Sequence, residues 1–367
     1  MNPGFSAGAR VVRVDAVPLD IALHAPFGIS GGAQERARNV LVTVELEDGT
    51  RGIGEAAPFP AYNGETQEQA RAALATAREA VEGRETGLEN WRELAAAFRA
   101  AGGAAAGSAQ CGFEMALLDA LTRRAGLPLW EFFGGAGREL ETDMTVTTGS
   151  PEESAAAARD IRARGIRTIK VKVGGRAGPD HDLARLRAIH AVAPDSPLIL
   201  DGNAGVSREA AKTLVGGLKA SGIAPALLEQ WLAKDDYAGA RELAAFSGWR
   251  LAADEAACTA ADVERLADAG AAQVVNIKLM KSGVAVALDL AAAAKRRGLG
   301  LMIGGNVESR LAMTFSACFA AGLGGFEFVD LDTPLFLATD PFVGGMRYEG
   351  ARVRLDSILA GAGMELA

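Results

Sequence analysis

The chain has 367 residues, 49% of them hydrophobic and 23% charged, a globular composition that excludes disorder along its whole length. Asp and Glu (46) outnumber Lys and Arg (38), and with a net charge of −8 and no long basic run, nucleic acid is not an expected partner. The sequence has no apolar run long enough to span a bilayer, no signal peptide and no disulfide framework among its three distant cysteines, so we expect a cytoplasmic protein.

The first part of the chain combines strand and helix patterns. Residues 11–17 and 40–46 alternate apolar and polar side chains, and a short third strand follows a turn, which predicts an antiparallel meander. Residues 66–99 are rich in Ala, Glu and Arg at helical spacing, and Ser108 is expected to cap another helix. We therefore expect an α+β domain over residues 1–125.

Beyond Leu140, short β-rich runs alternate with Ala-rich helical runs. Eight runs have strand character, at residues 142–148, 168–173, 198–203, 227–231, 251–255, 274–280, 300–304 and 326–332. Eight alternating β/α units predict a parallel closed barrel of the (β/α)8 type. We expect this barrel at residues 126–339, and a C-terminal hairpin pattern that returns the segment 340–367 to the N-terminal domain.

Charged residues stand at the C-terminal ends of the predicted strands, where such barrels gather their catalytic groups. Asp201, Glu229 and Asp254 end three successive strands and together suit a hard, oxygen-ligated cation such as Mg²⁺. One such carboxylate could equally cap the barrel rim, but three buried like charges need a counter-ion.

Lysines stand at the ends of the predicted strands on either side of these three carboxylate-bearing strands. Lys172 and Lys278 lie on the second and sixth strands, across the barrel from each other. A lysine beside a metal ion and another lysine has a lowered pKa, so either could act as a base near neutral pH. The alternative is that both lysines only neutralise the carboxylates. Lys170 either supports negative charge on a substrate or pairs with a neighbouring acid.

As a set, these motifs resemble the enolase superfamily, muconate lactonising subgroup, over nearly the whole chain. The matching motifs are Lys170-Val171-Lys172, Asp201-Gly202-Asn203, Glu229-Gln230, Asp254-Glu255 and Asn276-Ile277-Lys278. Asp330-Leu331-Asp332 looks like the DxD motif of dipeptide epimerases, which include the L-Ala-D/L-Glu epimerases. The resemblance implies the modified TIM barrel of that superfamily with an N-terminal α+β capping domain.

The resemblance also implies roles for individual residues. Asp201, Glu229 and Asp254 would bind Mg²⁺, and Lys172 and Lys278 would be the two acid/base catalysts. The implied substrate-binding residues are Lys170, Phe27, Glu308, Asp330 and Asp332, of which the last two would bind a dipeptide's α-ammonium group. Asn203 and Glu255 would orient ligands and lysines. The implied enzyme is an isomerase, a dipeptide epimerase that inverts the Cα of the C-terminal residue through a metal-stabilised enolate, and we expect it to be a homo-oligomer.

Other functions stay open at this point. N-Acylamino acid racemases, o-succinylbenzoate synthases and muconate cycloisomerases would use the same lysines and metal, but they bind no ammonium group, so the DxD motif argues against them. A Schiff-base aldolase would use one lysine as a nucleophile, and a non-catalytic barrel would only bind a small molecule. Asp330 and Asp332 could also merely cap the segment after Thr333 or pair at the barrel rim.

Two Gly- and Pro-rich capping loops, residues 27–34 and 58–65, are expected to exclude water and to select the substrate side chain. The first loop has Gly31 and Gly32 and no arginine before Arg36. Since it offers space but no early positive charge, we expect a neutral, hydrophobic C-terminal residue in preference to Glu.

Overall fold

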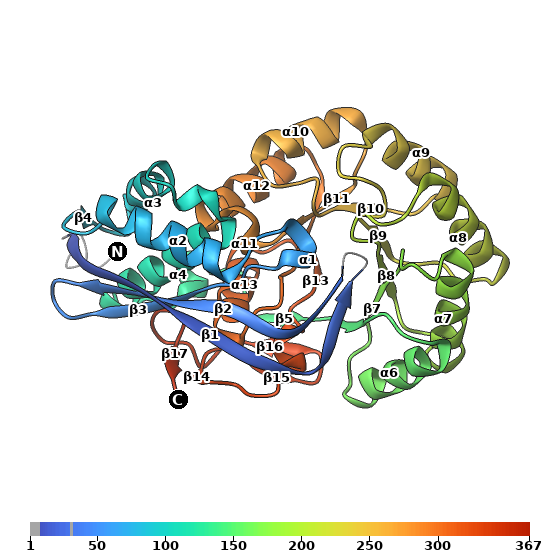
Figure 1. The fold of residues 1–367 in the computed structure, drawn as a ribbon, viewed down its shortest axis with the longest axis horizontal. Helices are drawn as coiled ribbons and strands as arrows, with labels where there is room; N and C mark the ends of the chain where they lie inside the picture. Colours follow the sequence, from blue (N-terminus) through green and yellow to red (C-terminus); the bar gives the residue numbers. More distant parts are fainter. Residues whose placement is uncertain (1–7, 30–31) are drawn as a thin grey trace.

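A computed structural model describes residues 8–29 and 32–367; the predicted loop residues Ser30 and Gly31 lie outside the described residues. An antiparallel sheet opens the chain, in the order β3-β2-β1-β4. Its strands are β1 (Ala9–Ile29), β2 (Gly32–Leu46), β3 (Arg51–Ala56) and β4 (Glu85–Thr86). The first three confirm the predicted meander. The long β1/β2 hairpin extends from this sheet to the barrel (Figure 1).

Helices cover this sheet. They are α1 (Pro60–Asn63), α2 (Gln67–Ala77), α3 (Trp91–Ala100) and α4 (Gly107–Arg124). The helical pattern at residues 66–99 is therefore interrupted, and Gly83, with φ of 82°, lies in a turn between α2 and α3. The expected cap at Ser108 is wrong: Ala106 is the N-cap of α4, and Ser108 instead donates to the Glu65 carboxylate.

The buried helix α4 packs directly on β3. Gly52 and Gly54 make this contact possible, because a Cβ atom on Gly52 would lie 2.1 Å from the backbone nitrogen of Ala120. Any larger side chain at either position would push the helix from the sheet. The two glycines therefore fix how closely the N-terminal strands and α4 approach.

Eight parallel strands follow in sequential order and form one curled sheet (Figure 1). They are β6 (Met144–Val146), β7 (Ile169–Lys172), β8 (Leu198–Asp201), β9 (Leu227–Glu229), β10 (Leu251–Ala253), β11 (Val274–Ile277), β12 (Gly300–Ile303) and β13 (Phe326–Val329). The main helices are α6 (Pro151–Ala163), α7 (Pro179–Val192), α8 (Arg208–Ala220), α9 (Tyr237–Ser247), α10 (Ala260–Ala269), α12 (Val284–Arg296) and α13 (Arg310–Leu323), with short helices α5 (Leu129–Phe132) and α11 (Leu279–Ser282). All eight predicted strands are present.

The eighth unit differs from the prediction. A 3-10 helix, η3 (Thr333–Phe336), follows β13 in place of an α-helix. Immediately after it, Leu337 forms an antiparallel bridge with Leu23 of β1, and Ala338 donates to the carbonyl of Ala22. The chain has to meet the β1/β2 hairpin at this point, which leaves no room for a long helix.

The two edge strands of the curled sheet meet through a mixture of backbone and side-chain bonds. The Asp143 amide donates to the Val329 carbonyl at 2.9 Å, and the Thr145 amide donates to Oδ2 of Asp332 at 2.6 Å. The Leu331 amide donates to the Thr142 hydroxyl at 2.9 Å. Asp332 therefore joins β13 to β6 through its side chain.

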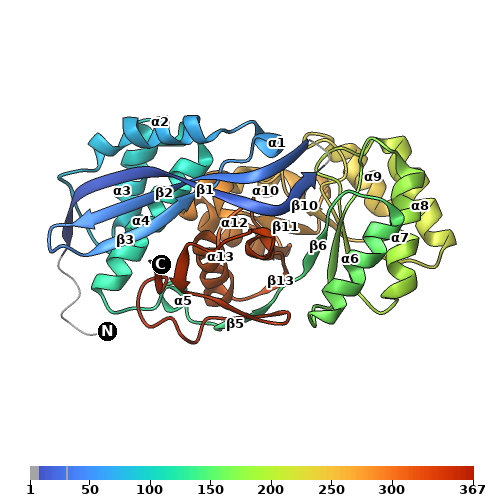
Figure 2. The same ribbon diagram turned by 60° about the horizontal axis from the view of Figure 1, so that its bottom comes forward.

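The C-terminal segment returns toward the N-terminal sheet (Figure 2). It forms the pairs β14 (Phe342–Gly344) with β17 (Met364–Leu366), and β15 (Arg347–Glu349) with β16 (Arg352–Arg354), the latter extended by β5 (Glu139–Glu141). The predicted hairpin is present. Asp119 of α4 accepts from the amides of Ala362 and Ile53 at 2.8 and 2.9 Å, so this carboxylate ties the C-terminal segment to the first sheet.

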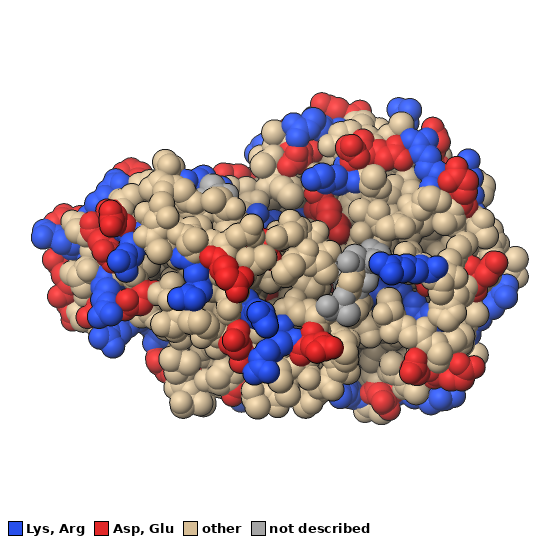
Figure 3. All heavy atoms as spheres, viewed as in Figure 1, with Lys and Arg blue, Asp and Glu red and all other residues tan. Residues whose placement is uncertain are grey.

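Acidic and basic side chains are interspersed over the face shown in Figure 3. Within the described ranges, every helix is too short or too polar to cross a membrane.

Glu55 of β3 links the N-terminal sheet to the barrel. Its fully buried carboxylate accepts bonds from the amides of Ser309 and Ala312, at 3.0 and 3.3 Å, and from the Ser309 hydroxyl. It also accepts from the Asn39 side chain at 2.5 Å. These amides are the unpaired donors at the N-terminus of α13, where a negative charge also suits the helix dipole.

We expect Glu55→Ala to lower the free energy of unfolding by about 3 kcal/mol, because it leaves several buried donors without an acceptor. Chemical denaturation of the purified protein measures this loss. Glu45→Ala is the matched control: Glu45 lies on the same sheet and pairs with Arg51, whose side chain is 67% exposed, so its loss should stay below about 1 kcal/mol. Equal losses in both variants would contradict the proposed link.

Candidate active site

A small cavity lies at the C-terminal ends of the barrel strands. It is lined by Phe27, Phe59, Tyr62, Thr145, Lys172, Asn203, Lys278, Gly305, Asn306, Asp330, Asp332 and Thr333. The three aromatic residues come from β1 and from the segment around α1, so the two predicted capping loops contribute to the wall. Six of the sequence-predicted residues line the cavity: Phe27, Lys172, Asn203, Lys278, Asp330 and Asp332.

The predicted metal ligands lie beneath this cavity and are fully buried. Asp201 and Glu229 end β8 and β9 and are paired residues in the strand register, and Asp254 directly follows β10. Each carboxylate thus projects from one of three neighbouring strands. Their positions follow from the parallel sheet, in which equivalent strand ends meet at the same edge.

Lys170 holds these acids together. Its ammonium nitrogen lies 3.0 Å from Asp201, 2.8 Å from Glu229 and 2.7 Å from Asp330. Burial alone would lower the pKa of Lys170, but Asp201 and Asp330 raise it well above its usual value. Lys170 is therefore a buried, charged lysine surrounded by three carboxylates, and it donates a hydrogen bond to Asp330.

Lys172 and Lys278 approach the carboxylates from opposite ends of the row. Lys172 of β7 lies 2.6 Å from Asp201, and Lys278, directly after β11, lies 2.7 Å from Asp254. Burial lowers the pKa of Lys278, but the neighbouring Asp254 raises it above its usual value.

The residues present fit a hard cation. Glu229 Oε2 and Asp254 Oδ2 are buried and accept no hydrogen bond from the described residues, although a lysine lies beside each. Burial, together with Asp201, raises the pKa of Glu229 to about 7. Three adjacent carboxylates with free oxygen lone pairs are the donor set that Mg²⁺ prefers.

Several residues near these carboxylates were not assigned a role from the sequence. The Asn276 side chain donates to Glu229 at 2.7 Å, and Lys281 lies 3.2 Å from Oδ1 of Asp254. The Tyr62 hydroxyl donates to the same Asp254 oxygen at 3.1 Å. Asn276 stands within a quoted motif and could have been found there. Tyr62 is distant in sequence and reaches the site only through the fold.

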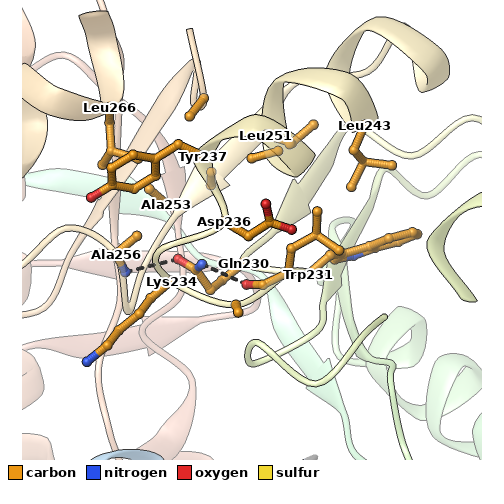
Figure 4. Close-up of a pocket in the computed structure, with 15 residues that line it drawn as sticks. Gln230, Trp231, Lys234, Asp236, Tyr237, Leu243, Leu251, Ala253, Ala256 and Leu266 are labelled. Atoms are coloured by element: carbon orange, nitrogen blue, oxygen red, sulfur yellow. Dashed lines mark hydrogen bonds between the residues drawn. The ribbon is translucent and has the colours of Figure 1, made fainter. Parts of the chain in front are cut away.

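Gln230 fixes the turn after β9. Its Oε1 accepts from the Ala256 amide and its Nε2 donates to the Leu232 carbonyl (Figure 4). The same Oε1 also accepts from the Asp254 amide at 2.9 Å. Gln230 therefore holds the backbone of Asp254. The neighbouring Trp231 is buried, and its indole donates to the Leu200 carbonyl at 2.9 Å.

Asp330 and Asp332 reach the cavity after β13, and a further acid lies behind them. Asp143 is 1% exposed, and one oxygen from each of Asp143, Asp330 and Asp332 lies within 4.8 Å of the other two. Burial, with Asp330 and Asp332 nearby, raises the pKa of Asp143 well above its usual value, and burial with Asp330 raises that of Asp332 to about 7. Asp143 was missed because it precedes β6 and stands outside the quoted motifs.

The remaining predicted residues lie near the site. Asn203 donates from its backbone to Asp201 at 3.0 Å, and its side chain is 3.5 Å from Glu255. Glu308 is fully buried, and its carboxylate accepts from the Asn306 amide. Glu308 is not among the described residues that line the cavity, so the structure does not bring it into direct contact with the space where a ligand would bind.

Arg185 of α7 fixes the strand end that carries Lys172. Its buried guanidinium donates to the carbonyls of Lys172 and Thr147, at 2.7 and 2.6 Å, and to the Ser154 hydroxyl at 3.0 Å. Asp182 lies 3.2 Å from it and accepts from the Gly174 amide. One arginine thus holds the ends of β6 and β7 together, which sequence periodicity on α7 does not reveal.

Comparison with known proteins gives the following matches. Residues 153–367 match the enolase C-terminal domain-like family, and residues 11–134 match the mandelate racemase/muconate lactonizing enzyme N-terminal domain. An aromatic dipeptide epimerase from Herpetosiphon aurantiacus is 51% identical over 97% of this chain and 99% of its own length.

Two solved structures extend these matches. A mandelate racemase/muconate lactonizing protein from the same organism has a TM-score of 0.93 at 50% identity, covering 98% of this chain and 99% of its own. A dipeptide epimerase from Cytophaga hutchinsonii, complexed with Mg and the dipeptide D-Ala-L-Val, has a TM-score of 0.90 at 30% identity, covering 98% of this chain and 96% of its own.

We expect Arg185→Met to lower the free energy of unfolding by about 3–5 kcal/mol, since it leaves Asp182 buried without its cation. Chemical denaturation measures the loss. Arg187→Met is the matched control on the same helix, because Arg187 is exposed and bonds only the Ser221 hydroxyl among its recorded partners. If both variants unfold alike, Arg185 does not hold the strand ends.

Proposed function

The chain belongs to the mandelate racemase/muconate lactonizing enzyme family of the enolase superfamily, and we propose that it is a Mg²⁺-dependent dipeptide epimerase that inverts the Cα of the C-terminal residue. The observation that carries the proposal is the placement of Lys172 and Lys278, which enter one cavity on either side of three buried carboxylates. The similar aromatic dipeptide epimerase supports the reaction, and the similar Mg-containing structure supports the metal.

Asp201, Glu229 and Asp254 would hold the Mg²⁺. When bound, the ion supplies positive charge that stabilises an enolate and lowers the pKa of nearby lysines. Lys170 adds a fixed positive charge at the same place, since it is buried between Asp201 and Glu229. Gln230 and Asn276 keep the carboxylates in position through the bonds described above.

The two lysines divide the proton transfer. One removes the Cα proton, and the other returns a proton to the opposite face, so the configuration inverts. Strands β8, β9 and β10 separate β7, which ends at Lys172, from β11, which precedes Lys278. Arg185 fixes the backbone of Lys172, while Asp254 and the Tyr62 ring, 4.5 Å from the ammonium nitrogen, fix Lys278.

The two acids after β13 would bind the α-ammonium group of the dipeptide. Asp330 and Asp332 line the cavity and carry the charge that such a cation needs. An N-acylated amino acid has no ammonium group to offer them. In a racemase of that kind Asp330 would keep only Lys170, and Oδ1 of Asp332 would stay without a hydrogen-bond donor. Phe27, Phe59 and Tyr62 would enclose the substrate from the opposite side.

We expect Glu229→Gln to lower kcat by several orders of magnitude, because the enolate loses part of its electrostatic stabilisation. Exhaustive chelation of the unmodified enzyme should have the same effect, and added Mg²⁺ should restore activity only to the unmodified enzyme. Epimerisation of a dipeptide, followed by polarimetry, measures both. Full activity after chelation would contradict the metal requirement.

We expect Lys172→Ala and Lys278→Ala each to abolish epimerisation. Each variant should still exchange the Cα proton of one epimer with deuterated solvent, because the surviving lysine faces only one side of Cα. Mass spectrometry detects the gain of one mass unit. If one variant exchanged the Cα proton of both epimers, the two lysines would not be bases that act on opposite faces of Cα.

We expect a dipeptide with a hydrophobic C-terminal residue to have at least a tenfold higher kcat/KM than the same dipeptide ending in Glu. The described wall of the cavity contains three aromatic rings, and its only basic side chains are the two lysines assigned to proton transfer. A dipeptide library incubated in deuterated buffer ranks the substrates. Ala-Glu as the best substrate by a wide margin would overturn this expectation.

A further inference from the structure

We propose that Asp143 is a third carboxylate of the site for the substrate's α-ammonium group, and that the site therefore selects a primary amine. The inference rests on the proposed function, since it adds a residue and a chemical restriction to the same substrate. It starts from a buried acid whose carboxylate accepts no hydrogen bond from the described residues.

Asp143 has no partner for its side chain. Both of its carboxylate oxygens are buried and accept no hydrogen bond from the described residues, and Asp332 Oδ1 beside it is also without one. An acid in this position is costly unless a proton or a cation joins it. Its backbone, by contrast, is fixed by the bond from its amide to the Val329 carbonyl. Asp143 is thus held firmly in place with its side chain unsatisfied.

Lys170 borders the cluster but makes no hydrogen bond to Asp143. Its ammonium nitrogen lies 3.0, 2.8 and 2.7 Å from oxygens of Asp201, Glu229 and Asp330, and it donates a hydrogen bond to Asp330. Asp332 has one oxygen bonded by the Thr145 amide, which brings no full charge. Asp143 and Asp332 therefore each keep at least one buried oxygen that accepts no hydrogen bond from the described residues.

The spacing of the three acids fits a nitrogen with three donors. Three atoms that all lie within 4.8 Å of one another share a central point at most about 2.8 Å from each, which is the length of a charge-assisted N–H···O bond. A primary ammonium group has three N–H donors, one for each carboxylate. An N-methylated amine has only two, so it would leave one acid unpaired and place a methyl group against it.

Two acids of the cluster line the cavity. Asp330 and Asp332 are part of the cavity wall, and Asp143, on the side of β6, is buried behind them with one oxygen within 4.8 Å of an oxygen of each. Asp143 does not line the cavity itself, so an ammonium group would meet it only after that group enters between Asp330 and Asp332. The same three oxygens could also accept an inorganic cation such as K⁺, and the experiment below separates the two.

The test compares L-Ala-L-Phe with N-methyl-L-Ala-L-Phe in the holoenzyme and in Asp143→Asn, with kcat and KM from polarimetry and binding from calorimetry. We expect the unmodified enzyme to prefer the primary amine at least tenfold. Asp143→Asn should raise KM and Kd for L-Ala-L-Phe at least tenfold, change kcat much less, and reduce the preference for the primary amine. Its Tm without substrate should not fall, because the variant removes an unpaired buried charge.

Asp119→Asn is the matched control, since it also neutralises a buried aspartate but lies outside the barrel; its KM and amine preference should not change. An Asp143→Asn variant with unchanged KM and unchanged amine preference overturns the inference and leaves the epimerase proposal standing. A second result would also overturn the inference without affecting the epimerase proposal. If K⁺ alone stabilises the substrate-free enzyme, and this stabilisation disappears in Asp143→Asn, then the cluster holds an inorganic cation. An unmodified enzyme that neither binds nor epimerises any free dipeptide contradicts the proposed function and, with it, this inference.

Discussion

The centre of this protein depends on one constraint: acids buried at the strand ends must be matched by positive charge. Lys170 forms ion pairs with Asp201, Glu229 and Asp330. Lys172 pairs with Asp201 and Lys278 pairs with Asp254, at the two ends of the carboxylate row. Removing Lys170 would leave Glu229 without its ion pair in a medium that solvates a carboxylate poorly. The arrangement of charges therefore supports the folded core and prepares the site for an anionic intermediate.

Buried acids also join the helices and strands that surround the barrel. Glu55 of β3 accepts from the first amides of α13, Glu65 accepts from the Ser108 amide at the start of α4, and Glu114 of α4 accepts from the Ala285 amide in α12. None of these three carboxylates forms an ion pair with a lysine or arginine of the described residues, although the charge of Arg99 acts on Glu114. Unpaired helix amides take the place of a cation. The walls of the cavity are thus attached to the barrel by directional bonds as well as by apolar packing.

Sequence patterns predicted what depends on local periodicity. All eight strands and the placement of Lys172, Asp201 and Glu229 at their ends follow from a parallel sheet, in which every strand end arrives at the same edge. Tyr62, Asp143 and Arg185 were missed because their roles arise from contacts between distant segments. The 3-10 helix after β13 was not foreseen for the same reason, because its place depends on the contact with β1. Local patterns also misplaced the cap at Ser108, whose hydroxyl serves Glu65 instead.

The lysines at the two ends of the carboxylate row give the cavity nearly equivalent chemistry on both faces of the reacting carbon. Under the proposed reaction, the catalyst itself favours neither epimer. The Haldane relation requires the ratio of kcat/KM for the two epimers to equal the equilibrium constant between them. Diastereomers that differ at one centre have similar free energies, so that constant should be close to unity. Net flux is then set outside this protein, by whichever neighbouring reaction supplies one epimer or consumes the other stereospecifically.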